Sequence, residues 1–339
     1  MNAKTLSFTT FNLLNLNRPD AIMYGRPGPG AAEVAQKIEW TGRMMARAAA
    51  DVIGFQELWH PEPLEAALAL AGLADTHDLV VPPDCDGADI VCAAAVRKGL
   101  QAAPAAWIER FPDGIRLESS GRQEKAPPIS VDVAGFSRPV LRLVLQPRTD
   151  AAPVHVFVCH LKSKRPTVIS DEAWYKNARS LYKPHAGDIG SAISTIRRTA
   201  EALALRVILN GVMKDTRDAV AVLGDLNDGQ DSNTIDLITR QPRYLEPLST
   251  GGSDVALYSG QALQQLRSLR DVYYTYIHEG QHGSLDHILV SEELYDQSRR
   301  RMWKFDGLDI FNDHLGRKEP GAADHGVVRA RFSLRRAVS

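Results

Sequence analysis

The sequence of residues 219–228 is AVAVLGDLND, an apolar run that stops abruptly at polar residues. Ala219 to Leu223 are small, aliphatic and partly β-branched, which is typical of a buried β-strand. Asp225 and Asn227 follow directly, where the end of such a strand presents side chains to a cleft at the sheet edge. One polar strand end has an ordinary explanation as a turn or a helix cap.

The same arrangement recurs at five other positions along the chain. The polar residues near an end of these strand-like runs are Asn12, Glu57, His160, Asp286 with His287, and Asp324 with His325. Six polar strand ends in one chain indicate a shared site rather than six unrelated turns. Period-two alternation turns His287 away from Asp286, so we expect a packing role for that histidine.

Strands and helices alternate along the chain. We expect strands at residues 6–14, 51–56, 90–96, 129–133, 140–145, 154–159, 219–223, 271–277, 287–290 and 327–332, and helices at 32–50, 62–71 and 191–209. No repeat and no linker is evident, and the strand pairs suggest hairpins as well as crossovers. These features predict one α+β domain over residues 1–339, with sheets packed together and helices outside.

Composition excludes several classes of protein. With 40 basic and 41 acidic residues the net charge is -1, so any binding of a polyanion must be local. Three cysteines without C-x-x-C spacing predict reduced core residues rather than disulfides. The strand-like N-terminus and the lack of an apolar stretch near ~18 residues predict a cytoplasmic protein without membrane contact. No obligate protein partner is evident.

Five of these segments resemble, in order, the motifs of the endonuclease/exonuclease/phosphatase superfamily, which includes DNase I, abasic-site endonucleases, sphingomyelinases and inositol-phosphate phosphatases. They are Phe11-Asn12, Gln56-Glu57, Gly224 to Asn227, Leu285 to Ser291, and Ala323-Asp324-His325. The resemblance spans nearly the whole chain. It implies a four-layered α/β sandwich (DNase I-like) with two central, mostly antiparallel β-sheets flanked by helices. Ala323 stands where the terminal motif usually has serine.

The chemistry of phosphodiester hydrolysis explains the residue types. A cation must offset charge on the phosphate oxygens, and hard Mg²⁺ or Mn²⁺ takes oxygen ligands. Glu57 and Asp324 are suited to bind that metal ion, and Asn12 to help hold the site.

The resemblance also implies catalytic roles. Asp225 and Asn227 would orient the attacking water and the phosphate, with Asp225 as base or as a second metal ligand. His325 would contact the phosphate or abstract a proton while Asp286 holds its tautomer. His160 would donate to a phosphoryl oxygen or protonate the leaving group.

The segment HLKSKRP, residues 160–166, indicates a polyanionic substrate. Lys162 and Lys164 lie close to His160, and Arg197 and Arg198 on the following helix offer further phosphate contacts. HLKSK resembles a segment of bacterial secreted-type nucleases, which favours DNA or RNA. Residues 162–190 are basic and aromatic without clear period, so we expect a long substrate loop.

The aromatic residues of this segment, Trp174, Tyr175 and Tyr182, leave two interpretations open. They can stack on bases or form a local hydrophobic cluster.

The sequence therefore predicts a divalent-metal-dependent phosphodiester hydrolase, a nuclease acting on DNA or RNA. A phosphomonoesterase or phospholipase acting on a small molecule or lipid headgroup remains the alternative, because the net charge is nearly neutral. A non-catalytic binding protein with the same fold is the third hypothesis.

Overall fold

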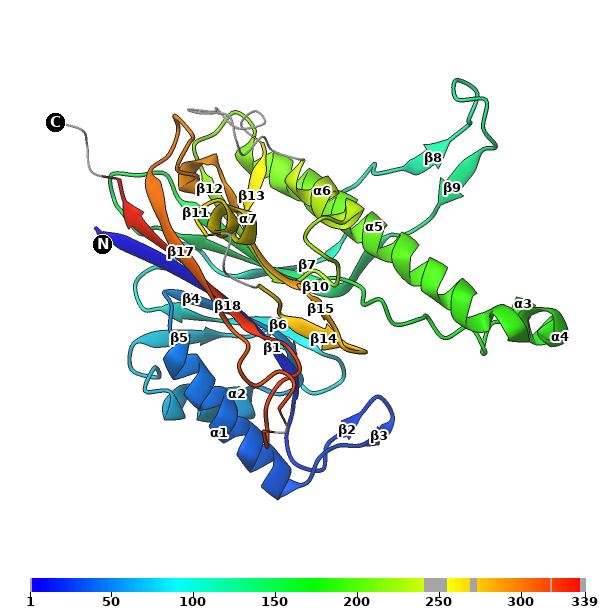
Figure 1. Cartoon of the computed structure of the whole chain (residues 1–339), viewed down its shortest axis with the longest axis horizontal. Helices are drawn as coiled ribbons and strands as arrows, with labels where there is room; N and C mark the ends of the chain where they lie inside the picture. Colours follow the sequence, from blue (N-terminus) through cyan, green and yellow to red (C-terminus); the bar gives the residue numbers. More distant parts are fainter. Residues whose placement is uncertain (1, 241–254, 269–272, 318, 336–339) are drawn as a thin grey trace.

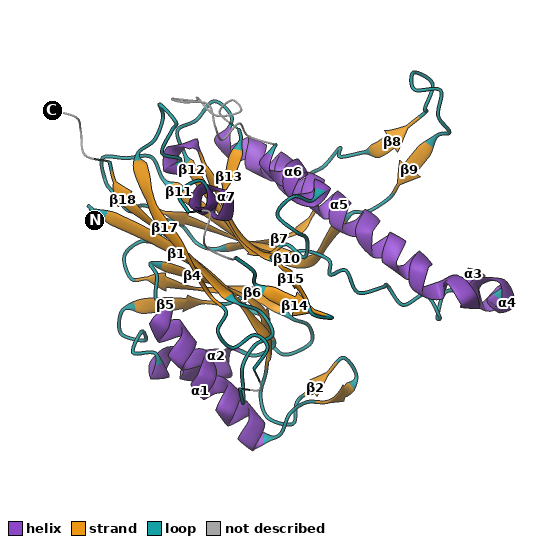
Figure 2. Ribbon diagram, in the orientation of Figure 1, coloured by secondary structure: helices purple, strands orange, loops and turns teal. Residues whose placement is uncertain are grey.

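Two six-stranded sheets face each other at the centre of the protein (Figures 1 and 2). The computed structural model describes residues 2–240, 255–268, 273–317 and 319–335. Among these residues, no helix has the length and apolar character needed to cross a membrane.

The first sheet has the strand order β17-β18-β1-β4-β6-β5. Its strands are β17 (Trp303–Phe311), β18 (Val327–Leu334), β1 (Thr5–Leu16), β4 (Val52–Leu58), β6 (Val91–Arg97) and β5 (His77–Val80). Only β1 and β4 run parallel among these neighbours. Their parallel pairing brings the ends of both strands, and hence Asn12 and Glu57, to the same edge of the sheet.

The second sheet has the order β13-β16-β12-β11-β10-β7. Its strands are β13 (Leu257–Ser259), β16 (Asp286–Ser291), β12 (Ala219–Asp225), β11 (Val154–His160), β10 (Gly135–Leu145) and β7 (Ala106–Arg110). Again one neighbouring pair, β11 and β12, is parallel. The mostly antiparallel sheets expected from the sequence are therefore confirmed.

Helices cover the outer faces of both sheets. α1 (Ala31–Arg47) and α2 (Pro61–Leu70) pack on the first sheet, whereas α5 (Ala186–Met213) and α6 (Asn233–Thr239) cover the second (Figure 2). The short α7 (Gly260–Gln265) packs against β16 and β17. The result is the four-layered α/β sandwich that the sequence predicts.

Apolar side chains between the sheets form the central core. Leu6 and Phe8 of β1 point into this core with Val158, Leu223 and other strand residues, whereas Phe11 and Leu13 pack toward α1. The sheets approach closely at Gly54, where an added Cβ would lie 2.9 Å from a methyl group of Val158. Since β1 is buried on both faces, the first polar side chain in its second half, Asn12, is also buried.

Two segments project away from the sandwich in Figure 1. One is the hairpin of β8 (Leu117–Ser119) and β9 (Ile129–Val131), and the other is the first half of α5 with α3 (Ala173–Asn177), α4 (Arg179–Tyr182) and the 3-10 helix η1 (Lys183–His185). The expected long loop at 162–190 was therefore wrong in its second half, which is helical. In short helices without an apolar face, the apolar residues do not repeat at a helical period, so the sequence did not predict these helices.

The remaining differences concern short or irregular elements. The expectation of a strand at 271–277 lies partly outside the described residues, and strand structure there is limited to β14 (Tyr276–His278), which pairs with β15 (Gln281–Gly283). A second small hairpin joins β2 (Ile22–Met23) to β3 (Arg26–Pro27). The sequence analysis missed β17, where a register shift at Gly307 interrupts the alternation.

Candidate active site

Three strands of the second sheet have a polar residue at the same edge and in one register, where β11 and β12 end and β16 begins. His160 of β11 pairs with Asp225 of β12, and Asp225 pairs with Asp286 of β16. Side chains directly opposite each other across a ladder lie about 5 Å apart at Cβ. The pairing therefore places three predicted catalytic residues in a row.

The turn after β12 depends on close approach of the backbone. A Cβ on Gly224 would lie 2.1 Å from the carbonyl oxygen of Cys159, so β11 and β12 leave room only for glycine there. Asn227 has a positive φ of 55°. Its backbone N–H donates to Asp225 Oδ1 at 2.9 Å, and its side-chain Nδ2 donates to Leu161 O at 3.0 Å. These contacts fix Asp225 and the residue after His160 together.

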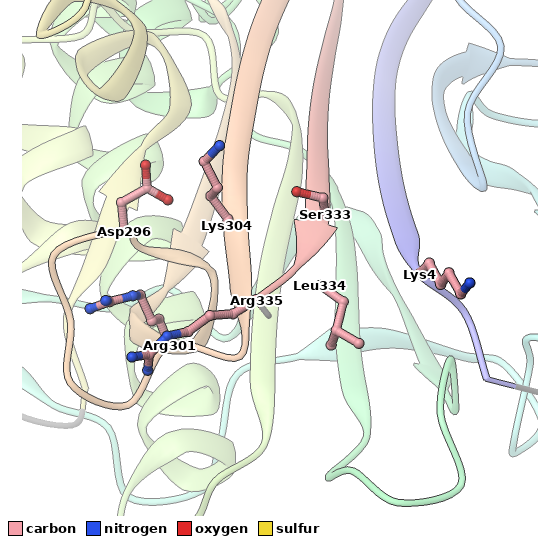
Figure 3. Close-up of a pocket in the computed structure, with 7 residues that line it drawn as sticks. All are labelled: Lys4, Asp296, Arg301, Lys304, Ser333, Leu334 and Arg335. Carbon is pink, nitrogen blue, oxygen red and sulfur yellow. The ribbon is translucent and has the colours of Figure 1, made fainter. Parts of the chain in front are cut away.

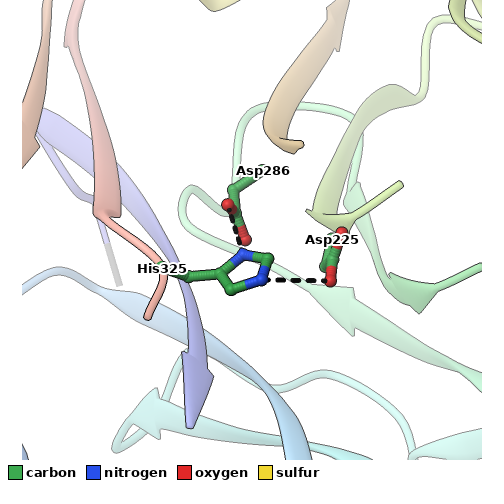
Figure 4. A group of neighbouring side chains, drawn as sticks. All are labelled: Asp225, Asp286 and His325. Atoms are coloured by element: carbon green, nitrogen blue, oxygen red, sulfur yellow. Dashed lines mark hydrogen bonds and ion pairs between the residues drawn. The ribbon is translucent and has the colours of Figure 1, made fainter. Parts of the chain in front are cut away.

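His325 and Asp286 form a buried pair that faces Asp225 (Figure 4). His325 Nδ1 lies 2.8 Å from Asp286 Oδ2, and His325 Nε2 lies 4.0 Å from Asp225 Oδ2. Burial alone lowers the pKa of His325, but the carboxylates of Asp286 and Asp225 outweigh it and raise that pKa to about 10. The imidazolium is therefore the form that this site stabilises.

Asp225 is almost fully buried between these groups. Burial raises the pKa of its carboxyl to about 7, an increase that the charge of His325 opposes and that of Asp286 supports. A carboxyl with a pKa near neutrality is suited to accept a proton during a reaction.

Asn12 links the two sheets through its side-chain amide. Its Nδ2 donates to Asp225 Oδ2 at 3.1 Å and to Glu57 Oε1 at 3.3 Å. Glu57 itself has a positive φ of 62°, and its second oxygen accepts the backbone N–H of Asn15 at 3.1 Å. Asn12 thus holds two carboxylates near each other that would otherwise repel.

His160 completes the buried group. Its Nε2 lies 3.6 Å from Asp225 Oδ2 and 3.8 Å from Glu57 Oε1. Burial, together with the charge of Arg138, holds the pKa of His160 well below its ordinary value. This histidine is therefore neutral at physiological pH, unlike His325.

Asp324 directly precedes His325 and is exposed. It lines a small cavity of about 230 Å³ together with Leu14, Ile277 and His314. Burial lowers the pKa of Lys37 on α1 to about 8, although the negative charges of Asp324 and Glu57 act to raise that pKa. The sequence analysis missed Lys37, because nothing in a helical pattern distinguishes a lysine that faces two carboxylates from an exposed one.

The donor atoms fit a hard divalent cation. The polar atoms of Asp225, Asp286 and His325 all lie within 4.8 Å of one another, and the carboxylates are the available ligands because the imidazolium of His325 has no free lone pair; Asp286 Oδ1 has no hydrogen-bond partner. Glu57 adds a further carboxylate oxygen beside them. Because the carboxylates predominate, the set favours Mg²⁺ or Mn²⁺ over softer metals. The predicted ligands Asn12 and Glu57 are next to this group, and Asp324 is adjacent to His325.

The predicted phosphate-binding cations occupy different environments. Lys164 Nζ lies 3.0 Å from Asp228 Oδ1, and Arg197 is exposed on α5. Lys162 directs its ammonium toward the carbonyl oxygens of Ser163 and Arg165. Lys162, Lys164 and Arg197 therefore remain candidates for contact with an anion.

Arg198 is buried and has a structural environment instead. It is 4% exposed, and it donates through Nε to Asp228 Oδ2 at 3.3 Å and through Nη1 to Lys162 O at 3.2 Å. With its guanidinium held in this way, we reassign Arg198 from substrate binding to support of the loop after His160. His287 packs on the same network, and its Nε2–H donates to Asp228 O at 2.9 Å.

Glu201 is a buried residue that the sequence analysis did not identify. Its two carboxylate oxygens accept the backbone N–H of Ser137 at 2.8 Å and of Lys162 at 2.7 Å. It therefore clamps the start of β10 to the segment after β11. A glutamate on the buried face of an amphipathic helix is the signal that could have revealed it.

Arg138 enters the site beside that clamp. Its Nη1 donates to Leu161 O at 3.2 Å, and its charge contributes to the lowered pKa of His160. The segment Phe136-Ser137-Arg138-Pro139 lies in the first part of β10, and the role of Arg138 depends on a contact that no local sequence pattern predicts.

Aromatic residues form two separate groups. Tyr276 of β14 lies over His325, with ring centroids 4.9 Å apart. Trp174 contacts Tyr182 edge-on at 4.9 Å and Tyr175 at 6.1 Å, at the far end of α5 from the sheets (Figure 1). This arrangement favours the local cluster over base stacking for the Trp174 group.

Two facing sheets, with buried carboxylates, an imidazolium and a neutral imidazole at their ends, form an arrangement suited to a hydrolase. The sequence model described as the Endonuclease/Exonuclease/phosphatase family matches residues 9–325. The protein belongs to that family, whose members hydrolyse phosphoric esters.

Solved structures share the fold at low sequence identity. An endonuclease/exonuclease/phosphatase from Bacteroides vulgatus is 13% identical, with a TM-score of 0.55 over 98% of this chain and 100% of the other. The human Nocturnin catalytic domain with bound sulfate anion is 14% identical, with a TM-score of 0.55 over 98% and 95%. D. rerio TDP2 complexed with single strand DNA product is 13% identical, with a TM-score of 0.55 over 98% and 100%. No curated protein sequence matches the chain.

Proposed function

We propose that the protein is a divalent-metal-dependent phosphodiesterase that cleaves nucleic acid. The observation that carries this proposal is the position of Asp225, buried between His325 Nε2 at 4.0 Å and His160 Nε2 at 3.6 Å. Hydrolysis of a phosphoric ester by water needs a group that accepts a proton from the water and groups that donate hydrogen bonds to the phosphoryl oxygens. The Asp225 carboxyl and the two imidazoles can supply these groups.

Each buried side chain has a role in this proposal. Asp225 accepts a proton from the attacking water, whose oxygen bonds to phosphorus as the ester P–O bond breaks. The leaving oxygen takes the bonding electron pair and is protonated by solvent water. His325, protonated and oriented by Asp286, donates Nε2–H to a phosphoryl oxygen. His160 donates from its neutral form to a second phosphoryl oxygen.

The carboxylates of Glu57 and Asp324, with Asn12 beside Glu57, would hold Mg²⁺ or Mn²⁺. When bound, such an ion offsets negative charge on the phosphate oxygens and favours the ionised carboxylates. Asn12 keeps Glu57 and Asp225 aligned through its amide, at 3.3 and 3.1 Å.

Cations around the site support a polynucleotide substrate. The cations are Arg138 on β10, Lys162 and Lys164 just after β11, and Arg197 on α5. Several phosphates of one strand can contact them at the same time. The bound sulfate of the Nocturnin structure and the single-stranded DNA product of the TDP2 structure are in keeping with this reading for a shared fold.

The test is a substrate panel. Purified protein is incubated with single- and double-stranded DNA and RNA in Mg²⁺, Mn²⁺ or EDTA, with Asp225→Asn as the matched inactive variant. We expect cleavage of at least one polynucleotide that EDTA and Asp225→Asn both abolish. Intact polynucleotides under every metal condition would overturn the proposal.

A small-molecule phosphoester is the second candidate, favoured by the net charge of -1. Release of inorganic phosphate or of a phosphorylated headgroup, with polynucleotides left intact, would establish it instead. We also propose a cytoplasmic location, because Cys92 and Cys159 are buried as free thiols and Cys85 is free as well.

A further inference from the structure

A basic groove lies at the end of the sandwich opposite the candidate active site. It has a volume of about 830 Å³ and is lined by Lys4, Asp296, Arg301, Lys304, Ser333, Leu334 and Arg335 (Figure 3). Lys4 precedes β1, and Asn12 lies eight residues further along the same strand. At about 3.3 Å per residue the two ends are separated by roughly 26 Å.

The groove has four cationic side chains and one carboxylate. That carboxylate is already engaged, since Asp296 Oδ2 lies 2.5 Å from Arg267 Nη2, and Asp296 Oδ1 accepts the backbone N–H of Phe305 at 2.7 Å. Asp296 therefore balances Arg267, which does not line the groove. The cations that line it retain their charge toward an incoming ligand.

Most of these cations lack a counter-ion within the protein. Among the described residues, no carboxylate lies within ion-pair distance of Lys4, Arg301 or Arg335, and Lys304 Nζ is 3.9 Å from Asp306. The Arg335 side chain extends toward Arg301 in Figure 3. Cations gathered in a concave surface without counter-ions raise the local concentration of anions.

The backbone around the groove is well anchored. Leu334 N–H donates to Lys4 O at 2.8 Å, and Arg335 N–H donates to Met302 O at 3.0 Å. Arg301 Nη1 donates to Ser298 O at 2.9 Å. The cations thus project from fixed strand ends, and binding requires little ordering of the chain.

The lining residues can bind the charged phosphates of a nucleic acid, but they offer no side chain that would recognise its bases. They include no aromatic ring for stacking and no side-chain amide, and the Ser333 hydroxyl donates to Asp306 at 2.9 Å. Contacts to phosphate position a nucleic acid without reading its sequence. The groove therefore suits a phosphate backbone rather than a free nucleotide, whose base would find no partner.

We propose that this groove is a second binding site for the phosphate backbone of single-stranded nucleic acid. This inference rests on the proposed nuclease function, to which it adds a second contact that holds the substrate strand. Holding a distal part of a long strand raises the effective concentration of the rest at the catalytic cleft. At about 3.4 Å per nucleotide, roughly eight nucleotides are needed to span both sites.

The test compares two triple variants of the full-length protein. Arg301→Gln, Lys304→Gln and Arg335→Gln neutralise the groove, whereas Lys98→Gln, Lys214→Gln and Arg217→Gln remove the same charge at exposed positions elsewhere. Fluorescence anisotropy in EDTA measures the Kd for labelled single strands of about 30 and about 4 nucleotides over a salt series. Thermal unfolding confirms that both variants fold.

We expect the groove variant to bind the long strand about tenfold more weakly than the control does, with the salt slope reduced by about 2 and the short strand unaffected. Equal Kd values for the long strand in both variants would overturn the inference. So would loss of tripolyphosphate binding in the groove variant with long-strand binding intact, because the site would then serve a small polyphosphate.

Binding and cleavage separate this inference from the proposed function. Wild-type protein that binds the long strand through the groove but cleaves no polynucleotide would contradict nuclease activity alone. Wild-type protein that cleaves long and short strands equally well, with unchanged activity in the groove variant, would contradict the second contact alone.

Discussion

The contact of 2.8 Å between His325 Nδ1 and Asp286 Oδ2 joins the two sheets of the sandwich. Asp286 belongs to β16 of the second sheet, whereas His325 lies two residues before the start of β18 in the first. The pair is buried, and it fixes which imidazole nitrogen faces Asp225. Alignment of the sheets and protonation of the site are therefore coupled through one hydrogen bond.

Asp286→Asn should reduce kcat by about 10³-fold while the fold is retained, because an amide neither stabilises the imidazolium nor holds its tautomer. Steady-state kinetics on the substrate found in the panel measures the loss, and circular dichroism checks the fold. His325→Gln is the matched variant, and the double variant should be no worse than either single one. Independent, multiplicative losses would show that the two residues do not act as a unit.

Glu201→Gln should raise KM more than it lowers kcat. The carboxylate accepts two backbone N–H groups, and an amide accepts one and opposes the other, so Lys162 and Arg138 lose their alignment. We expect a loss of about 2 kcal/mol in unfolding free energy from urea titration. Glu65→Gln, an exposed position on α2, is the control. An unchanged KM in the Glu201 variant would exclude the positioning role.

Gly224→Ala should destabilise the protein by about 3 kcal/mol, because the new Cβ would lie 2.1 Å from Cys159 O at the point where His160 and Asp225 pair. Gly211→Ala on α5 meets nothing within 4 Å. That control should be neutral or stabilising by about 0.5 kcal/mol, since alanine favours the helix. Similar midpoints of thermal unfolding for both variants would contradict the close approach of β11 and β12.

The contribution of His155 and His287 to the unfolding free energy should fall as the pH is lowered from 7 to 5, opposite in sign to that of Asp225, whose carboxyl pKa is raised to about 7. Burial lowers the pKa of His155 and His287 below the value of about 6.5 in the unfolded chain. The unfolded state then binds more protons below that value, so stability is complete above it and is lost as pH falls. Urea titrations at several pH values measure the trend.

His155→Gln provides the comparison for this pH dependence, because His155 bonds Asp218 at 3.0 Å and Arg142 at 3.1 Å, away from the active site. The variant should show a smaller decrease between pH 7 and 5 than the wild type. A decrease of the same size would assign the effect to other groups.

Removing divalent cations should leave the sandwich folded but lower its thermal midpoint. Asn12 lies between the two carboxylates, and its Nδ2 donates to Glu57 Oε1 at 3.3 Å and to Asp225 Oδ2 at 3.1 Å. These hydrogen bonds reduce the repulsion between the carboxylates when no cation is bound. Added Mg²⁺ or Mn²⁺ should raise the midpoint through binding to the folded state. Glu57→Gln should reduce that increase, and an unchanged increase would remove Glu57 from the proposed ligands.

Local patterns were sufficient for most of the fold. Apolar runs such as 154–159 and 219–223 predicted the buried strands β11 and β12, and the helix at 191–209 matched the apolar face of α5. The weak points were irregular segments, because β17 contains the interruption at Gly307 and α3 and α4 are too short for a period. Periodicity reports burial only where several turns or pleats repeat it.

The sequence by itself determined which residues stand at the strand ends, because apolar runs and turn residues are encoded locally: Asn12, Glu57, Asp225 and His325 were all visible there. Only the tertiary structure decided which of them meet. The register of β11, β12 and β16 aligns His160, Asp225 and Asp286, and the facing of the two sheets brings Asn12 and His325 to the same carboxylate. Burial lowers the pKa of both histidines and keeps His160 neutral, whereas the carboxylates of Asp286 and Asp225 keep His325 cationic, a difference that depends on neighbours distant in sequence.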